Sequence, residues 1–217
     1  MRLASYASVT VALILIVAKT AAWLTTGSVA VLSSLVDSLL DAIASVVTLV
    51  AIQHSLQPAD HEHRFGHGKV EALAAMAQSA FIVGSAVLLL FEAGARALDP
   101  RPIEKGEIGI YVMLFSIGLT ISLVMFQRWA IAKSGSVAIS ADSLHYQGDL
   151  LLNTAVIAAI LLVSELGWVM ADPIFGAAIA FYIIWSAYRI VRNSLDMLMD
   201  RELPDTEREK IRQIALR

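Results

Sequence analysis

Residues 72–91 read ALAAMAQSAFIVGSAVLLLF and contain no charged side chain. A helix needs about 20 predominantly apolar residues to cross the hydrocarbon core of a bilayer. Residues 108–127 form a second uncharged stretch of this kind, and residues 42–59 are nearly long enough. These stretches predict helices that cross a membrane.

Three further apolar segments complete a set of six spans, although Lys19 interrupts the first and Asp142, His145 and Asp149 lie within the fifth. We expect helices at about 4–24, 30–55, 69–97, 107–132, 138–164 and 173–197. Residues 1–199 would then form an all-α membrane domain of six transmembrane helices. Residues 200–217 read as the start of a cytoplasmic C-terminal domain that is truncated at Arg217.

The composition of the chain agrees with a membrane protein. Of 217 residues, 58% are hydrophobic and only 16% are charged, whereas a soluble domain carries about a quarter charged residues. A net charge of −3 argues against a nucleic-acid partner. The absence of cysteine excludes disulfides, thiolate zinc sites and iron–sulfur clusters. Any metal site must therefore use carboxylate and imidazole ligands.

The distribution of basic residues predicts the orientation. Most of the 16 Lys and Arg residues lie at the end that holds both termini and the connections after the second and fourth helices. The opposite end holds Arg96, Arg101 and Lys105, and Arg96 is expected to pair with Glu92 one turn away. Because cytoplasmic loops carry the excess of basic residues, both termini are expected in the cytoplasm.

Two of the expected spans carry matched pairs of ionisable residues. Asp37 and Asp41 lie four residues apart in the second helix, as do His145 and Asp149 in the fifth. This spacing places each pair on one helix face, and ionisable groups inside a membrane usually mark an ion pathway. If the two faces meet, three carboxylates and one imidazole converge, a set that suits Zn²⁺. Cd²⁺, Fe²⁺ and Mn²⁺ stay open as alternatives, because ligand type gives only a preference.

Other interpretations of the polar residues also follow from the sequence. The polar side chains could serve only to hold helices together by hydrogen bonds, as in a membrane assembly protein. Lys19 and His54 are expected to extend towards the lipid headgroups.

The connection after the second helix is rich in possible metal ligands. It reads DHEHRFGHGK at residues 60–69, with three histidines and two carboxylates within eight residues. These residues predict a second metal site at the membrane surface, against the alternative of a solvated polar loop.

Sequence motifs of enzymes are missing. His61 and Glu62 begin like a metalloprotease helix, but Phe65 stands where the second histidine would be required. There is no G-x-S-x-G motif, phosphate-binding loop or dinucleotide fingerprint, so we expect no organic cofactor and no enzymatic activity. An intramembrane zinc enzyme would need a base and a substrate cleft, and neither is indicated.

Three stretches together resemble the cation diffusion facilitators, and among them the bacterial zinc transporters of the YiiP (FieF) type. They are SVAVLSSLVDSLLD at 28–41, QPADHEHRFGHGKVEAL at 57–73 and ADSLHYQGD at 141–149. The resemblance implies a homodimer in the lipid bilayer of the bacterial inner membrane. It would export Zn²⁺ from the cytoplasm in exchange for H⁺ by alternating access, with helices 1, 2, 4 and 5 moving against helices 3 and 6.

The resemblance also assigns roles to individual residues. Asp37, Asp41, His145 and Asp149 would form the transport site, and Asp60, His63 and His67 the loop site. Leu144 would be a hydrophobic gate residue, and Lys69 with Asp200 would lock the membrane domain near the dimer interface. Members of this family usually continue into a cytoplasmic ferredoxin-like domain, which is largely absent from this chain.

Overall fold

Six long helices and one short helix make up the described part of the chain. The computed structural model describes residues 1–27, 29–98, 107–168, 170–202 and 205–216. The helices are α1 (Arg2–Thr26), α2 (Val29–Ser55), α3 (Lys69–Leu98), α4 (Glu107–Ser134), α5 (Val137–Leu166), α6 (Ala171–Leu198) and α7 (Asp205–Ala215). Each of the six long helices begins and ends within two residues of the range expected from the sequence.

Left-handed glycines follow three of the long helices, α1, α4 and α5, at Gly27, Gly135 and Gly167. Gly27 follows α1 with a φ of 63°, and its N–H donates a hydrogen bond of 2.8 Å to the carbonyl of Trp23. Gly135 follows α4 in the same way, with a φ of 65° and a bond of 2.8 Å to the carbonyl of Ile131. Glycine adopts this left-handed conformation without the steric cost of a Cβ, and so it terminates helices readily.

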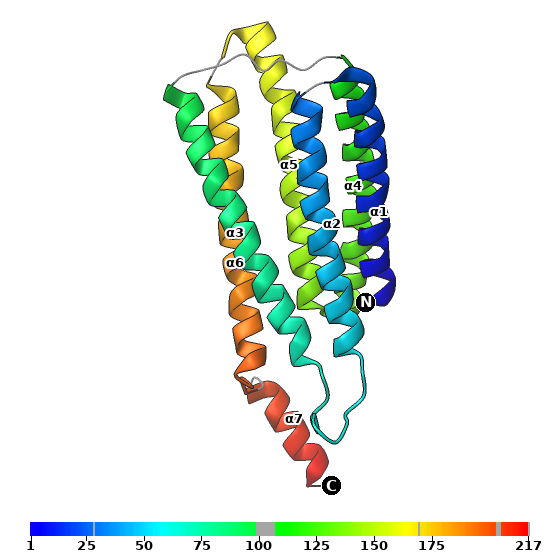
Figure 1. The fold of residues 1–217 in the computed structure, drawn as a ribbon. Coiled ribbons are helices and arrows are strands. Elements are labelled where there is room, and N and C mark those ends of the chain that lie inside the picture. The colour runs from blue at the N-terminus through cyan, green and yellow to red at the C-terminus, as the bar shows by residue number, and fades with distance from the viewer. Residues whose placement is uncertain (28, 99–106, 169, 203–204, 217) are drawn as a thin grey trace.

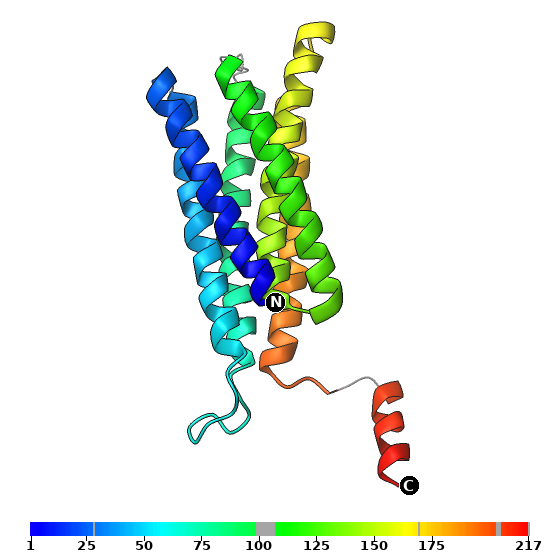
Figure 2. The ribbon, with the colours of Figure 1, turned by 90° about the vertical axis from the view of Figure 1, so that its right-hand side faces the viewer.

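The helices form a bundle with two parts. Helix α3 packs most extensively against α6, while α1, α2, α4 and α5 contact one another. Figure 1 shows α3 and α6 side by side along one flank of the four other helices. Among the described residues, the termini and the loop between α2 and α3 lie at the same end of the bundle (Figure 1, Figure 2).

The all-α membrane fold expected from the sequence is confirmed. Among the described residues, five helices are long and apolar enough to span a bilayer, namely α1, α2, α3, α4 and α6. The sixth long helix, α5, is 30 residues long, lies within the bundle and carries Asp142, His145 and Asp149.

Ion pairs join α3 to the α6 region at both ends. At one end, Arg96 forms contacts of 2.7 Å with Glu92 and with Asp172 in the first turn of α6. The expected Glu92–Arg96 pair is therefore confirmed and extended by a third residue. At the other end, Lys69 Nζ lies 2.8 Å from Asp200 Oδ2, just beyond α6. The predicted orientation also counted Arg101 and Lys105, and both lie outside the described residues.

Candidate metal site

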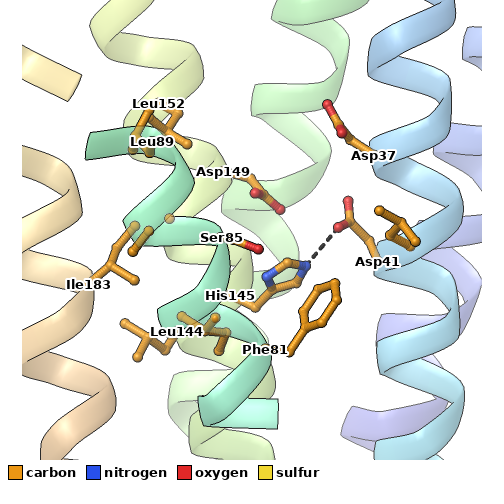
Figure 3. Close-up of a pocket in the computed structure, with 14 residues that line it drawn as sticks. Asp37, Asp41, Phe81, Ser85, Leu89, Leu144, His145, Asp149, Leu152 and Ile183 are labelled. Atoms are coloured by element: carbon orange, nitrogen blue, oxygen red, sulfur yellow. Dashed lines mark hydrogen bonds and ion pairs between the residues drawn. The ribbon is translucent and has the colours of Figure 1, made fainter. Parts of the chain in front are cut away.

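A polar pocket lies where α2, α3 and α5 approach one another. The pairs Asp37/Asp41 on α2 and His145/Asp149 on α5 line the same cavity of about 340 Å³. Figure 3 shows the side chains of α5 directed towards those of α2, with Phe81 and Ser85 of α3 beside them. The two helix faces that the sequence marked as polar therefore meet in space.

Three of these residues bring possible ligand atoms close together. One ligand atom from each of Asp41, His145 and Asp149 lies within 4.8 Å of the others. The Nε2 atom of His145 lies 2.7 Å from Oδ1 of Asp41, and their side chains are 11% and 14% exposed. This geometry allows a single small cation to contact all three residues after modest side-chain adjustment.

Asp37 lies slightly apart from this group. It lines the same pocket, but its carboxylate does not belong to the close set formed by Asp41, His145 and Asp149. Residues four apart on a helix are separated by about 6 Å along its axis. Figure 3 shows Asp37 one turn above Asp41 on α2. To act as a fourth ligand, its side chain would have to reach along the helix towards His145.

Close packing of α5 against α6 shapes the floor of the pocket. Gly148 lies between the two polar residues of α5, and a Cβ built on it would stand 3.0 Å from Cδ1 of Ile183. The absence of a side chain at position 148 thus lets α6 approach the helix that carries His145 and Asp149.

Leu144 borders the pocket on its apolar side. It is 4% exposed and packs in a buried cluster with Ile82, Ala86 and Ile183 from α3 and α6. It also lines a second, more polar pocket that includes Ser140. Leu144 thus borders both cavities.

Lys19 differs from its sequence-based expectation. It is 8% exposed instead of extending to the headgroups. Its Nζ donates hydrogen bonds of 2.6 Å to Oγ of Ser38 and 3.0 Å to the carbonyl of Ser34. The reason is that α1 packs against α2, and α2 offers oxygen acceptors within reach of the ammonium group. A positive charge therefore lies beside the helix that carries Asp37 and Asp41.

Sequence reasoning missed a buried hydrogen-bond network around Asp142. This residue is 1% exposed, and its carboxylate accepts hydrogen bonds from Gln127 Nε2 at 2.8 Å, Ser45 Oγ at 3.2 Å and Gln78 Nε2 at 3.3 Å. The hydroxyl of Tyr146 lies 2.9 Å from Ser45 Oγ. The network joins α2, α3, α4 and α5. Gln78 and Gln127 were the available signal, because glutamines within apolar spans usually seek a partner.

Asp142 therefore has the role given above as an alternative for the polar residues, because its hydrogen bonds hold helices together. Its neighbours His145 and Asp149, one and two turns along α5, face the pocket instead. These three residues share one face of α5, so the structural position and the pocket-lining positions differ along the helix axis.

The loop residues form a second close group. Ligand atoms of Asp60, His63 and His67 lie within 4.8 Å of one another. Asp60 Oδ1 accepts backbone N–H bonds from His63 at 2.5 Å and from Glu62 at 2.9 Å. The backbone N–H of His63, aided by that of Glu62, lowers the pKa of the Asp60 carboxyl below its usual value. An ionised Asp60 beside two imidazoles is a suitable ligand set for Zn²⁺.

The chain is similar in sequence to known proteins. A family model described as the cation efflux transmembrane domain matches residues 5–199. The chain is 49% identical to the cation-efflux pump FieF of Shewanella oneidensis over 214 residues, which cover 99% of this chain and 72% of that protein. It is 47% identical to the FieF pump of Pectobacterium atrosepticum, with 99% and 71% covered. It is 46% identical to that of Citrobacter koseri, with 98% and 70% covered.

Proposed function

Because this chain belongs to the cation efflux family, we propose that it exports Zn²⁺ from the cytoplasm in exchange for protons. It is a multi-pass inner-membrane transporter of divalent metal cations and not an enzyme. The proposal goes beyond family membership in four respects. The transported ion is Zn²⁺, transport is coupled to H⁺, the protein is a homodimer, and both termini lie in the cytoplasm.

The observation that carries the proposal is the close group formed by Asp41, His145 and Asp149. Two carboxylates and one imidazole within 4.8 Å match the oxygen and nitrogen ligands of Zn²⁺. Calcium and magnesium sites more often contain oxygen ligands alone. Asp37, which lines the same pocket, would complete a tetrahedral set.

The contact between His145 and Asp41 supports proton coupling. The 2.7 Å contact between His145 Nε2 and Asp41 Oδ1 is a hydrogen bond, which holds one proton between these two atoms. An imidazole nitrogen must lose its proton before it binds a metal. An ion that binds both atoms would therefore take the place of that proton, and a proton arriving from outside would displace the ion. Metal and proton thus compete for the same two atoms.

The division of the bundle supports alternating access. The pocket is lined by α2 and α5 on one side and by α3 and α6 on the other. Movement of the α3–α6 pair against the other helices would change access to His145 on α5. Leu144, which lines pockets on both sides of its side chain, is the proposed gate residue.

Metal flux into proteoliposomes tests the proposal. Asp41→Ala and His145→Ala should each reduce Zn²⁺ flux at least about tenfold, since each removes a ligand. Asp205→Ala is the matched control, because Asp205 is exposed on α7, far from the pocket. Unchanged flux in both pocket variants would exclude the assigned site.

A second set of flux measurements tests which ion the protein prefers and whether its transport is coupled to protons. Competing Cd²⁺, Fe²⁺ and Mn²⁺ should inhibit Zn²⁺ flux less effectively than unlabelled Zn²⁺. Imposing a pH gradient with the acidic side opposite the cytoplasmic face should accelerate export. Equal flux with and without the gradient would contradict the antiport mechanism.

A further inference from the structure

The two histidines of the loop group, His63 and His67, have a third histidine nearby, His54 at the end of α2. The ring centroid of His54 lies 6.0 Å from that of His67, and the centroids of His63 and His67 lie 4.4 Å apart. The rings of three histidines thus gather next to the carboxylate of Asp60. Neither His54 nor His61 belongs to the close group itself, but the His54 ring lies beside that of His67.

We propose that His54 is the fourth metal ligand of the loop site and completes a closed Asp–His₃ zinc centre. This inference rests on the proposed metal binding by Asp60, His63 and His67. It changes the nature of that site, because three protein ligands leave a coordination position open whereas four close the shell.

The distances fit this assignment. Two imidazoles that bind one Zn²⁺ at about 2.0–2.1 Å with tetrahedral angles have ring centroids roughly 5 Å apart. The two observed separations, 4.4 Å and 6.0 Å, lie on either side of this value. The His54 side chain is exposed, and its Nδ1 contacts only the exposed amide of Gln57, at 3.2 Å. Its ring can therefore turn by the required amount at little cost.

An unsatisfied atom within the cluster also indicates a missing ligand. The His67 side chain is 9% exposed, and its Nδ1 is buried without a hydrogen-bond partner among the described residues. Its Nε2 lies 3.5 Å from Asp60 Oδ2. Buried polar atoms are nearly always paired. Because Nε2 faces Asp60, the buried Nδ1 stays available to a further group that approaches the ring from its other side.

The position of His54 gives the site a structural consequence. His54 belongs to α2, Asp60 and His63 belong to the loop, and His67 stands two residues before α3 begins. An ion bound by all four would connect the end of α2 to the start of α3. These helices belong to the two different parts of the bundle. Zinc at this site would restrain their separation and report the metal concentration on the side of the loop.

Zinc binding by the full chain with the transport site removed tests the assignment. In an Asp41→Ala, Asp149→Ala background, one zinc ion should bind at the loop. His54→Ala and His54→Tyr should each weaken this binding at least about tenfold, since loss of supporting groups alone costs that much. His61→Ala is the matched control and should leave affinity unchanged.

Coordination number provides an independent readout. Co²⁺ in place of Zn²⁺ should give the intense visible absorption of a four-coordinate ion, and His54→Ala should weaken or shift it while His61→Ala does not. Equal affinity and spectra for the His54 and His61 variants would overturn the proposal, as would a loop that binds no metal. Neither outcome depends on transport, so failure here is distinguishable from failure of the export function.

Discussion

The ammonium group of Lys19 on α1 lies 2.6 Å from the hydroxyl of Ser38 on α2, beside the residues that line the metal pocket. Its charge interacts electrostatically with Asp41, Asp149 and Asp37. In the proposed transport site, this positive charge would repel a bound metal ion and so favour its release. It also links α1 to the helix that carries two of the proposed ligands.

Replacing Lys19 with Met should therefore strengthen zinc binding and slow transport. A lost repulsion of about 1.4 kcal/mol corresponds to tenfold tighter binding, and the slower release should reduce flux. Lys19→Arg keeps the charge and should behave more like the original protein. Binding calorimetry and proteoliposome flux would measure both effects. Lys133→Met serves as the control, because Lys133 lies over the ring of Trp129 and away from the pocket. Identical zinc affinity in Lys19→Met and in this control would refute the electrostatic role of Lys19.

Asp142→Asn should destabilise the fold without weakening metal binding. The amide nitrogen of Asn would replace one of the acceptor oxygens that Gln78 and Gln127 now contact, so buried donors would face each other. Leaving a buried donor unsatisfied costs about 1–3 kcal/mol. Thermal unfolding in detergent should reveal the loss, while zinc affinity stays within about threefold. A large fall in affinity with normal stability would instead place Asp142 in the transport site.

The loop turn held by Asp60 should resist mild acid. The N–H of His63 lowers the pKa of Asp60, so the stabilisation by the ionised carboxylate is fully present above the ordinary value of 3.8 and is lost only as pH falls through the lower, folded value. Hydrogen exchange at residues 60–63 should therefore show an unchanged turn from about pH 8 to about pH 5. Opening of the turn within this range would contradict the assignment.

Asp60→Asn separates the two roles of that side chain. The Asn oxygen can still accept the N–H bonds of Glu62 and His63, so the turn should persist. The missing negative charge should reduce zinc affinity of the loop at least about tenfold. An unchanged affinity would remove Asp60 from the ligand set.

Two variants of Asp200 should differ in stability. Asp200 has a φ of 52°, a conformation that Asp and Asn tolerate better than other residues. Asp200→Asn loses only the exposed ion pair with Lys69, which is worth about 0.5 kcal/mol. Asp200→Ala also removes the short polar side chain that can hydrogen-bond locally in the left-handed region, and should cost about 1 kcal/mol more. The free energy of unfolding would separate the two; equal losses would mean that backbone conformation is unimportant there.

The sequence predicted the helices well because long uncharged stretches have few alternatives to a membrane helix. The i, i+4 spacing also predicted which residues of α2 and α5 share a face. Spacing does not specify side-chain rotamers, which is why Asp37 was placed with Asp41 although its carboxylate lies apart. Nor does it identify the neighbours of a helix, so the burial of Lys19 and the partners of Asp142 emerged only from the packing of α1, α3 and α4.

The ion pairs at the two ends of α3 limit how that helix can move. Thirty residues of helix extend about 45 Å, with Arg96–Asp172 near one end and Lys69–Asp200 at the other. Sliding of α3 along α6 would break both contacts, whereas tilting of the two helices together breaks neither. Exposed pairs of this kind add little to stability. Their consequence is mechanical: axial translation within the pair loses both contacts at once, while rotation of the pair as one body keeps both.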